Sequence, residues 1–221
     1  MKLLSSLFIA VSLFLTITGC AQKSPNRVEI FRKTDKKDLS KLSQATFAAG
    51  CFWHEEALFE SIKGVNEAIS GYAGGNTSKP TYESIESGTT GHAETVNIYY
   101  DSTIINYATL LKAYFAAQDP TQVNGQGPDR GTQYRSIAFY RNNSEKLMIE
   151  DYIKKLNTSG KYNNPIAVQV APLVKFWQAE EYHQDYIRQN PGGGYVQNVS
   201  IPEIQHFQKQ YPELIKPDHK F

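Results

Sequence analysis

Strand-like and helix-like segments alternate along this chain, and this alternation constrains its fold more than any other feature. The connections between the segments vary too much in length for a regular doubly wound sheet. The sequence therefore predicts one domain with an α+β fold, a two-layer α/β sandwich around a mixed sheet. Strands are expected at 45–49, 94–100, 136–140 and 166–170, and helices at 52–63, after a cap at Asn106, after a cap at Ser144, and at 178–189.

Composition narrows the class of protein. Of the 221 residues 40% are hydrophobic and 12% aromatic, which is enough to close a core, and the net charge is only +1. Nucleic acid is not expected as a partner, because binding phosphates requires a clustered basic surface. Two cysteines are too few for a disulfide scaffold.

Two segments are rich in turn-forming residues. Gly71, Gly74 and Gly75 predict a loop that leads to Tyr82. The stretch from Asp119 to Ser136 is dense in Gly, Pro, Gln, Asn and Asp and shows no periodicity. A loop of that length inside a domain is more often functional than not.

The N-terminal segment is typical of an export signal. Lys2 precedes an apolar run from Leu3 to Ile17, which is too short to span a bilayer comfortably. The run ends in Ile17-Thr18-Gly19-Cys20, which resembles a bacterial lipoprotein signal, in which the cysteine is acylated after cleavage. An ordinary signal peptide with an incidental cysteine and a short membrane anchor are the alternatives.

The domain boundaries follow from this interpretation. Residues 1–19 are expected to be a signal peptide, 20–43 the lipidated Cys20 and a flexible tether, 44–201 the catalytic domain, and 202–221 a C-terminal extension that packs as a short helix. The basic tether either rests on anionic lipid or is a solvated linker. The predicted location is the bacterial cell envelope, as a membrane-anchored lipoprotein on the periplasmic or outer-surface side.

Cys51 is the candidate chemical centre. It lies where the strand ending at Gly50 turns into a predicted helix, and a helix N-terminus favours a thiolate. We therefore expect a lowered thiol pKa, with Phe52 and Trp53 as an aromatic wall beside the sulfur. The alternative is a buried, inert cysteine.

Glu94 is the second candidate. By strand parity it lies on the same face as Val96 and Ile98, so its carboxyl is expected to be desolvated, with a raised pKa. Such a group is a general acid at neutral pH, although an exposed glutamate at a strand end is the alternative. A nucleophilic sulfur beside a neutral acid suits a substrate oxygen that leaves as water.

Several motifs, in order, are similar to those of one enzyme family. Together they resemble the A-type peptide methionine sulfoxide reductases (MsrA) over roughly residues 47–190. The motifs are Gly50-Cys51-Phe52-Trp53, Gly71-Tyr72-Ala73-Gly74-Gly75, Pro80-Thr81-Tyr82, Gly88-Thr89-Thr90-Gly91-His92-Ala93-Glu94, Asp119-Pro120-Thr121, Asp129-Arg130-Gly131-Thr132-Gln133-Tyr134-Arg135-Ser136 and Glu180-Glu181-Tyr182-His183-Gln184-Asp185-Tyr186.

The resemblance implies a ferredoxin-like domain with long functional loops and a specific chemistry. The cysteine at position 51 would attack the sulfur of methionine S-sulfoxide, free or in proteins, while Glu94 protonates the oxygen. Methionine would leave and Cys51 would remain as a sulfenic acid. The enzyme would repair oxidatively damaged proteins.

The resemblance also implies roles for the residues around the reacting atoms. Tyr82 and Tyr134 would hydrogen-bond the sulfoxide oxygen, and Phe52 and Trp53 would hold the substrate methyl group. Asp129 would organise the site through hydrogen bonds. Tyr82 and Tyr134 also have an alternative interpretation as ordinary core tyrosines, in a chain with 14 tyrosines.

The sequence departs from the family at two places. His54 stands where many relatives have glycine, and it either touches the thiolate or points to solvent. The tail from Gly192 to Phe221 has no resolving cysteine, and the other cysteine in the chain is Cys20. Regeneration is therefore expected to need an external thiol, from a thioredoxin-like or glutaredoxin-like protein or a small thiol.

Other predictions concern cofactors and assembly. No bound cofactor and no metal are expected, since Glu180 with His183 is a single pair with weak metal-like spacing. His92 is either a donor behind the site or, as we favour, simply the residue at a strand start. We expect a monomer.

Two other functions compete with the reductase. A one-cysteine thiol peroxidase would need a cation beside the sulfur, where this sequence has Phe52 and Trp53. A lipoprotein that binds peptides through its aromatic surface would need no chemistry at Cys51.

Overall fold

The computed structural model describes residues 38–221 and is built on one mixed sheet. The six strands run in the order β7-β6-β1-β3-β2-β8, and only β6 and β7 pair in parallel. A separate two-stranded hairpin pairs β4 with β5. The strands are β1 (Ser43–Ala48), β2 (Val65–Ala73), β3 (Ala93–Tyr100), β4 (Gly125–Gln126), β5 (Asp129–Arg130), β6 (Ile137–Tyr140), β7 (Gln169–Pro172) and β8 (Phe176–Gln178).

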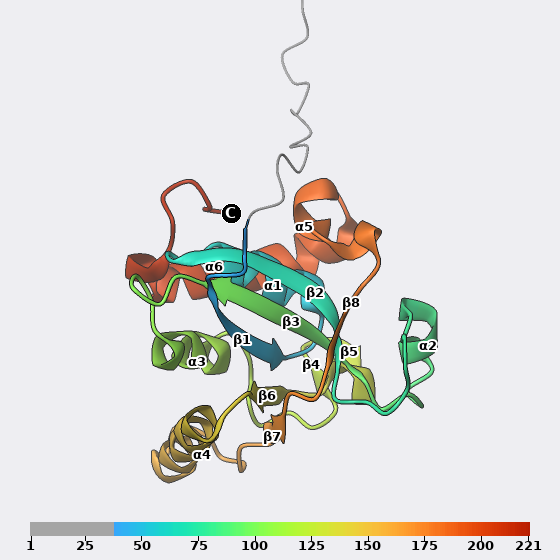
Figure 1. Ribbon diagram of the computed structural model, residues 1–221. Helices are drawn as coiled ribbons and strands as arrows, with labels where there is room; N and C mark the ends of the chain where they lie inside the picture. Colours follow the sequence, from blue (N-terminus) through green and yellow to red (C-terminus); the bar gives the residue numbers. More distant parts are fainter. Residues whose placement is uncertain (1–37) are drawn as a thin grey trace, which may run out of the picture. The chain divides into compact units, whose positions relative to one another are not determined.

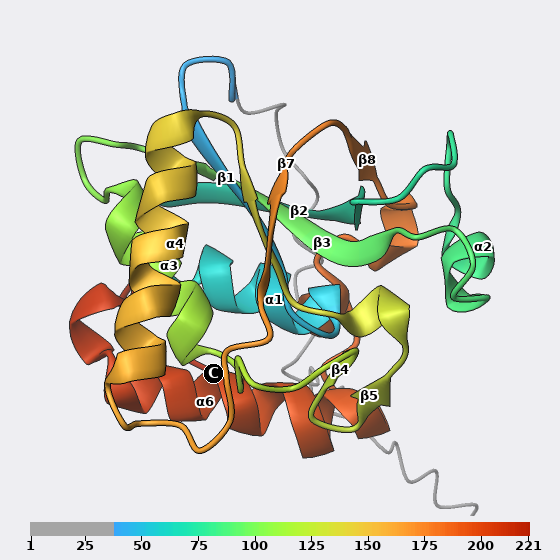
Figure 2. The same cartoon turned by 90° about the horizontal axis from the view of Figure 1, so that it is seen from below.

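The longer helices all lie on one side of this sheet (Figures 1 and 2). They are α1 (Phe52–Glu60), α3 (Tyr107–Ala116), α4 (Asn143–Thr158) and α6 (Ile201–Gln210), while α2 (Tyr82–Glu86) and α5 (Tyr186–Gln189) are short. The core follows β1-α1-β2-β3-α3-β6 in sequence and β6-β1-β3-β2 in space, which is the ferredoxin-like arrangement. The predicted α+β sandwich around a mixed sheet is confirmed.

Aromatic side chains fill the space between β1 and the helices. Phe47 on β1 stacks on Tyr114 of α3 at 4.5 Å and on Phe59 of α1 at 5.9 Å between ring centroids. Tyr114 also donates a hydrogen bond of 3.0 Å to the carbonyl of Ala48. This bond satisfies a buried hydroxyl while the ring contributes its area to the core. Much of the aromatic content is therefore structural.

The helix predicted over 178–189 is wrong. The segment begins with Gln178, the last residue of β8, and contains a 3-10 turn at Glu181–His183 and only the single turn of α5. Asp185 has φ of +54°, which interrupts a right-handed helix. The side chain of Gln184 accepts a hydrogen bond from the amide of Ser70 and donates one to the Ser70 carbonyl. It thus bonds to the backbone of β2 as a neighbouring strand would.

The glycine-rich segment is also different from the prediction, because β2 extends through Gly71 to Ala73. A Cβ at Gly71 would lie 2.3 Å from both the Trp177 carbonyl oxygen and the Phe176 ring. Glycine is therefore required here because β8 crosses β2 closely, and not because the chain turns.

Replacing Gly71 by alanine is expected to cost about 2–3 kcal/mol of unfolding free energy, since the methyl group would overpack the contact with β8. Urea denaturation measures this loss. Gly194→Ala is the matched control, because a Cβ there meets nothing within 4 Å. Equal stability of the two variants would contradict the close crossing of β2 and β8.

Two element boundaries shift by a few residues. The α4 cap is Asn142, whose side chain accepts from the amide of Glu145, and not Ser144. β7 begins at Gln169 because its pairing with β6 begins there, three residues later than predicted.

The C-terminal segment packs onto the domain. Phe207 is buried, and Ile215 bridges Ile62 at the end of α1. The amide of Lys63 donates to the Leu214 carbonyl at 2.8 Å. The boundary at residue 201 stays a prediction.

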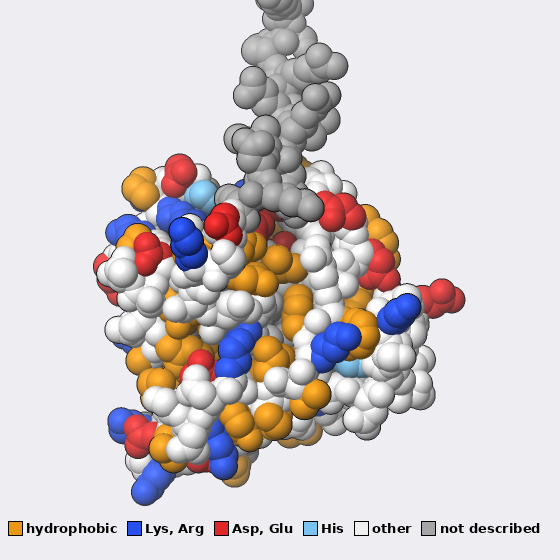
Figure 3. Space-filling model, viewed as in Figure 1, with side chains coloured by type: hydrophobic (Ala, Val, Ile, Leu, Met, Phe, Trp, Pro, Cys, Tyr) orange, Lys and Arg blue, Asp and Glu red, His pale blue; other side chains and the backbone are white. Residues whose placement is uncertain are grey.

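The predicted signal peptide, Cys20 and most of the tether lie outside the described residues. Within 38–221, no helix has the length and apolar character needed to cross a membrane. On the face shown in Figure 3, the Lys and Arg side chains are spread out among acidic and uncharged ones.

Candidate active site

Cys51 lies directly before α1, as its N-cap residue. Gly50 makes the turn from β1 with φ of +73°, and a Cβ there would lie 2.7 Å from the Cβ of Gln126. The Gly50 amide donates to the Tyr134 carbonyl at 3.2 Å. The predicted strand–glycine–helix position of Cys51 is present, and 9% of the residue is exposed.

The expectation of a lowered thiol pKa is wrong. Burial raises the pKa of Cys51 well above the ordinary value, and the nearby carboxyls of Glu94 and Asp129 raise it further. The amides of Trp53 and His54 at the start of α1 oppose this shift, but they do not outweigh it. The local helix effect is present, and desolvation of the sulfur is larger. Cys51 therefore rests as a thiol.

Glu94 is buried at the start of β3, with 2% of the residue exposed. Its Oε2 accepts a 2.9 Å hydrogen bond from the amide of Phe52, which is the residue after Cys51. Burial raises the pKa of Glu94 well above its ordinary value, and this hydrogen bond offsets only part of the rise. Glu94 is thus a neutral carboxylic acid next to the thiol, as strand parity indicates.

An aromatic wall begins directly after the cysteine. Phe52 is fully buried and stacks on Tyr82 with centroids 6.5 Å apart. Trp53 stacks on Tyr186 at 3.6 Å, and its Nε1 donates to Nδ1 of His183 at 3.0 Å. These contacts fix the orientation of both rings. Such a wall suits an apolar methyl group.

Two tyrosine hydroxyls lie near the same carboxyl. For both Tyr82 and Tyr134, burial is the main cause of a raised pKa, and the nearby Glu94 carboxyl is the next. Tyr134 donates to Oε1 of Glu86 at 3.2 Å, and the amide of Tyr82 donates to Oε1 of Glu180 at 3.0 Å. Both phenols stay protonated. The Tyr134 hydroxyl has one proton, so it must turn away from Glu86 before it can donate to a substrate.

Asp129 lies on β5 and accepts a hydrogen bond from the hydroxyl of Tyr195. Tyr195 is also within interaction distance of the Cys51 thiol. Sequence reasoning missed Tyr195, because it follows three glycines between the predicted helix over 178–189 and the C-terminal extension, where the sequence shows no periodicity. Only the packing of the C-terminal segment against the domain brings it to the sulfur.

The other candidate polar residues have structural partners. Glu180 accepts from the Tyr72 hydroxyl at 2.7 Å as well as from Tyr82. His92 precedes β3, and its ring accepts from the Gly75 amide at 3.2 Å and contacts the Thr77 carbonyl at 2.9 Å. It therefore holds the loop before Tyr82, which is more than a strand-start role. Within residues 38–221, no three or more His, Cys, Asp or Glu side chains lie together so that they could hold one metal ion.

Replacing Asp129 by asparagine is expected to lower the pKa of Cys51, because one of the negative charges that oppose the thiolate is removed. Alkylation by iodoacetamide at about pH 8 should become severalfold faster, since only the thiolate reacts. The exposed Asp151→Asn change on α4 is the control and should leave the rate unaltered. A slower reaction in Asp129→Asn would contradict this electrostatic assignment.

The ferredoxin-like domain sets a buried cysteine beside a neutral carboxylic acid and an aromatic wall, an arrangement suited to an oxidoreductase. The family model described as peptide methionine sulfoxide reductase matches residues 43–215. This chain therefore belongs to the peptide methionine sulfoxide reductase family, and it is an oxidoreductase that reduces methionine sulfoxide.

Individual relatives agree. The peptide methionine sulfoxide reductase MsrA of Haloquadratum walsbyi is 46% identical over 171 residues, covering 77% of this chain and 97% of that protein. MsrA 1 of Rhodopirellula baltica is 44% identical over 176 residues, covering 80% and 91%. Reduced Mxr1 from Saccharomyces cerevisiae is similar in structure, with a TM-score of 0.66 and 34% identity over 73% of this chain and 92% of that one.

Proposed function

We propose that this protein reduces the S epimer of methionine sulfoxide, free and in proteins, through the sulfur of Cys51. The observation that carries the proposal is the bond from the Phe52 amide to Glu94, which fixes a neutral acid beside the cysteine. Attack of Cys51 on the sulfoxide sulfur, with proton transfer from Glu94 to the oxygen, releases methionine and leaves a sulfenic acid.

The remaining groups stabilise this reaction. Tyr82 and Tyr134 hydrogen-bond the sulfoxide oxygen, and Phe52 and Trp53 contact the methyl group. Asp129 holds Tyr195 beside the sulfur. A methyl sulfoxide has one apolar end and one strongly polar oxygen, which matches a wall of rings that faces hydrogen-bond donors.

Regeneration of Cys51 requires an external thiol. The chain has two cysteines, and Cys51 is the free cysteine of the described part. We propose that Cys20 is lipidated and anchors the mature protein in the bacterial envelope, so it is not a resolving cysteine. Repair of oxidised envelope proteins is the corresponding role.

Turnover of separated sulfoxide epimers tests the activity. We expect the S epimer to be reduced, with one methionine formed per enzyme before any thiol is added. Dimedone should then label Cys51 as a sulfenic acid. Equal consumption of the R epimer would contradict the proposed specificity, and a Cys20–Cys51 disulfide would contradict the one-cysteine mechanism.

A thiol peroxidase is the weaker candidate. Such an enzyme reacts through a ready thiolate, whereas burial and the nearby carboxyls of Glu94 and Asp129 raise the pKa of Cys51 and hold it as a thiol. Hydrogen peroxide consumption, measured beside sulfoxide reduction, separates these two activities.

A further inference from the structure

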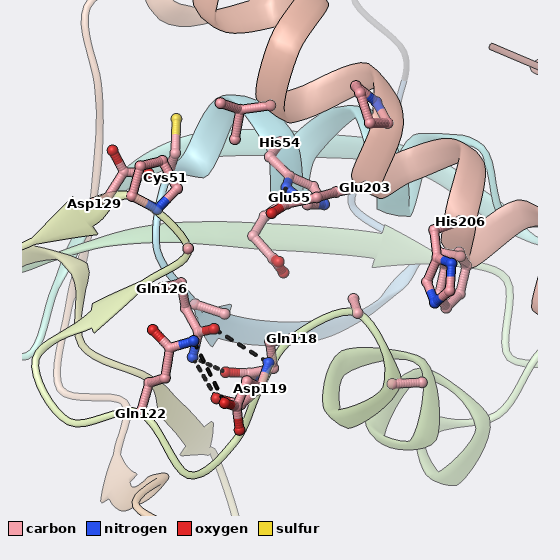
Figure 4. Close-up of a pocket in the computed structure, with 18 of the residues that line it drawn as sticks. Cys51, His54, Glu55, Gln118, Asp119, Gln122, Gln126, Asp129, Glu203 and His206 are labelled. Atoms are coloured by element: carbon pink, nitrogen blue, oxygen red, sulfur yellow. Dashed lines mark hydrogen bonds and ion pairs between the residues drawn. The ribbon is translucent and has the colours of Figure 1, made fainter.

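A cavity of about 410 Å³ reaches Cys51 from outside the proposed sulfoxide site. We name it the side cavity. Cys51 and Asp129 lie at one end and His206 at the other, with Glu55 pointing toward the middle (Figure 4). The proposed oxygen-binding and methyl-binding groups are not among its walls. The walls of the side cavity are formed by α1, the end of α3, the β4–β5 hairpin and α6.

Two buried side chains on the wall of the side cavity have polar atoms without partners. His54 is 7% exposed and Glu55 is 2% exposed. His54 Nδ1 pairs with Oε2 of Glu203 at 2.7 Å, but Nε2 has no hydrogen-bond partner, and neither has Oε2 of Glu55. An unpaired buried polar atom costs about 1–3 kcal/mol, which indicates a place where a ligand bonds.

These groups share one flank of α1 with the reactive sulfur. His54 follows Cys51 by three positions and Glu55 follows it by four, and residues at these spacings are neighbours on a helix surface. All three residues line the side cavity, so a molecule in it lies beside Cys51, His54 and Glu55 together.

The charges around the side cavity select among thiols. Four carboxyl side chains and two histidines line it, and its described walls contain no lysine or arginine. A thiol that carries carboxylates would be repelled, whereas one that carries an amine would be attracted. The acidic groups are Glu55, Asp119, Asp129 and Glu203. Burial raises the pKa of Glu55 to about 8, so the other three supply most of the negative charge near neutral pH.

We propose that the side cavity binds the reductant, a small thiol that carries an amine and no carboxylate, and that the ion-paired His54 handles its protons. This proposal rests on the proposed function, because the thiol acts on the sulfenic acid that sulfoxide reduction leaves on Cys51.

The first step forms a mixed disulfide. The thiolate of the reductant attacks the Cys51 sulfur, an S–S bond forms, and the S–O bond breaks. The leaving oxygen takes a proton from Nε2 of His54 and departs as water. The Cys51 sulfur is reduced and the reductant sulfur is oxidised.

The second step restores the enzyme. A second thiol gives its proton to neutral His54, and its thiolate attacks the reductant sulfur of the mixed disulfide. The disulfide of the reductant leaves, and Cys51 departs as a thiolate that takes a proton from water. Two thiols and one sulfenic acid thus give one disulfide, one water and one thiol.

The surroundings of His54 favour its charged form. Burial alone would lower its pKa. The hydrogen bond to Glu203 and the negative charges of Glu55, Glu203 and Asp129 outweigh burial, so the pKa of His54 is raised. The Glu203 carboxylate on α6 is thereby a positioning group for the imidazole.

The test separates the two half-reactions. Enzyme is first oxidised with one equivalent of methionine S-sulfoxide, and the methionine burst is measured. 2-Aminoethanethiol, 2-mercaptoethanol or mercaptoacetate is then added, and the loss of dimedone-reactive Cys51 is followed by mass spectrometry. Per thiolate, the amine thiol should react about tenfold faster than the carboxylate thiol, with the neutral thiol between them.

We call the loss of dimedone-reactive Cys51 after thiol addition the thiol step. The His54→Gln variant should slow the thiol step about tenfold or more, measured relative to its own rate of the methionine burst. Its thiol step should also rise steeply with pH, following the thiolate fraction in solution, while the wild-type rate changes less. The side chain of Glu203 is 45% exposed, so Glu203→Gln should fold normally. This variant should also slow the thiol step.

Access is tested by a matched pair on one loop. Gln122 lines the side cavity, while its neighbour Val123 points outward with 73% exposed. Gln122→Trp should slow the thiol step, and Val123→Trp should not. Equal rates in this pair, no preference among the three thiols, or an unaltered thiol step in His54→Gln would each overturn the proposal. Absence of the methionine burst in the wild type would instead overturn the proposed function.

Discussion

Cys51→Ser is expected to abolish the reduction of methionine sulfoxide, including the first methionine formed without added thiol. Removing the nucleophile of an enzyme typically lowers the rate by a factor of about 10⁴ or more. Serine keeps the size and the N-cap position, so the fold should persist and the loss should be chemical. The methionine burst, measured on the S epimer, is the readout.

The control for this change is Cys20→Ser, which removes the other cysteine and should leave the burst of the purified protein unaltered. A peptide-binding protein would keep its function in Cys51→Ser. Persistent sulfoxide reduction in that variant would therefore remove Cys51 from the mechanism.

Glu94→Gln is expected to slow the burst by about 10²–10⁴, the usual contribution of a general acid. Glutamine can still accept from the Phe52 amide at the same place, so the geometry is retained while the transferable proton is lost. Glu83→Gln, on the exposed face of α2, is the control.

The pH profile gives the second readout for Glu94. Because burial raises its folded pKa, the acid is protonated at neutral pH, and the burst rate should fall as the pH rises through that value. Glu94→Gln should lack this alkaline fall. A profile identical to that of the wild type would exclude Glu94 as the acid.

Stability should follow the same titration. When the pKa of a carboxyl is higher in the folded state than in the unfolded state, its contribution to the unfolding free energy is fully present below the unfolded-state pKa of about 4.3. This contribution is lost as the pH rises toward the folded-state pKa. The unfolding free energy of Glu94→Gln should therefore depend less on pH over that interval.

Local patterns predicted the residues whose environment is set by their own segment. Glu94 is buried as strand parity predicted, although Thr95 and Asn97 on the opposite face of β3 are buried as well. The glycine before Cys51 indicated the sharp turn that φ of +73° shows. The Asn106 cap is also present, because its side chain accepts from the nearby amide of Thr109. For Asn106 the deciding contact is only three positions away in the sequence.

Contacts between distant segments were beyond such reasoning. The helix predicted over 178–189 is absent, and Gln184 instead bonds to Ser70, 114 positions earlier. His54 does not point to solvent, since it is buried and pairs with Glu203 on α6. The pKa of the Cys51 thiol is raised where the sequence predicted that it is lowered. The start of α1 is a local feature that the sequence shows, whereas the burial of Cys51 depends on the whole fold.

A protonated resting sulfur has one more consequence, for the working life of the catalyst. Peroxides and other oxidants attack the thiolate form, so a cysteine held neutral by its surroundings is a poor target for them. The protein can thus persist under the oxidising conditions that create its substrate, and its sulfur need become nucleophilic only when a sulfoxide occupies the site.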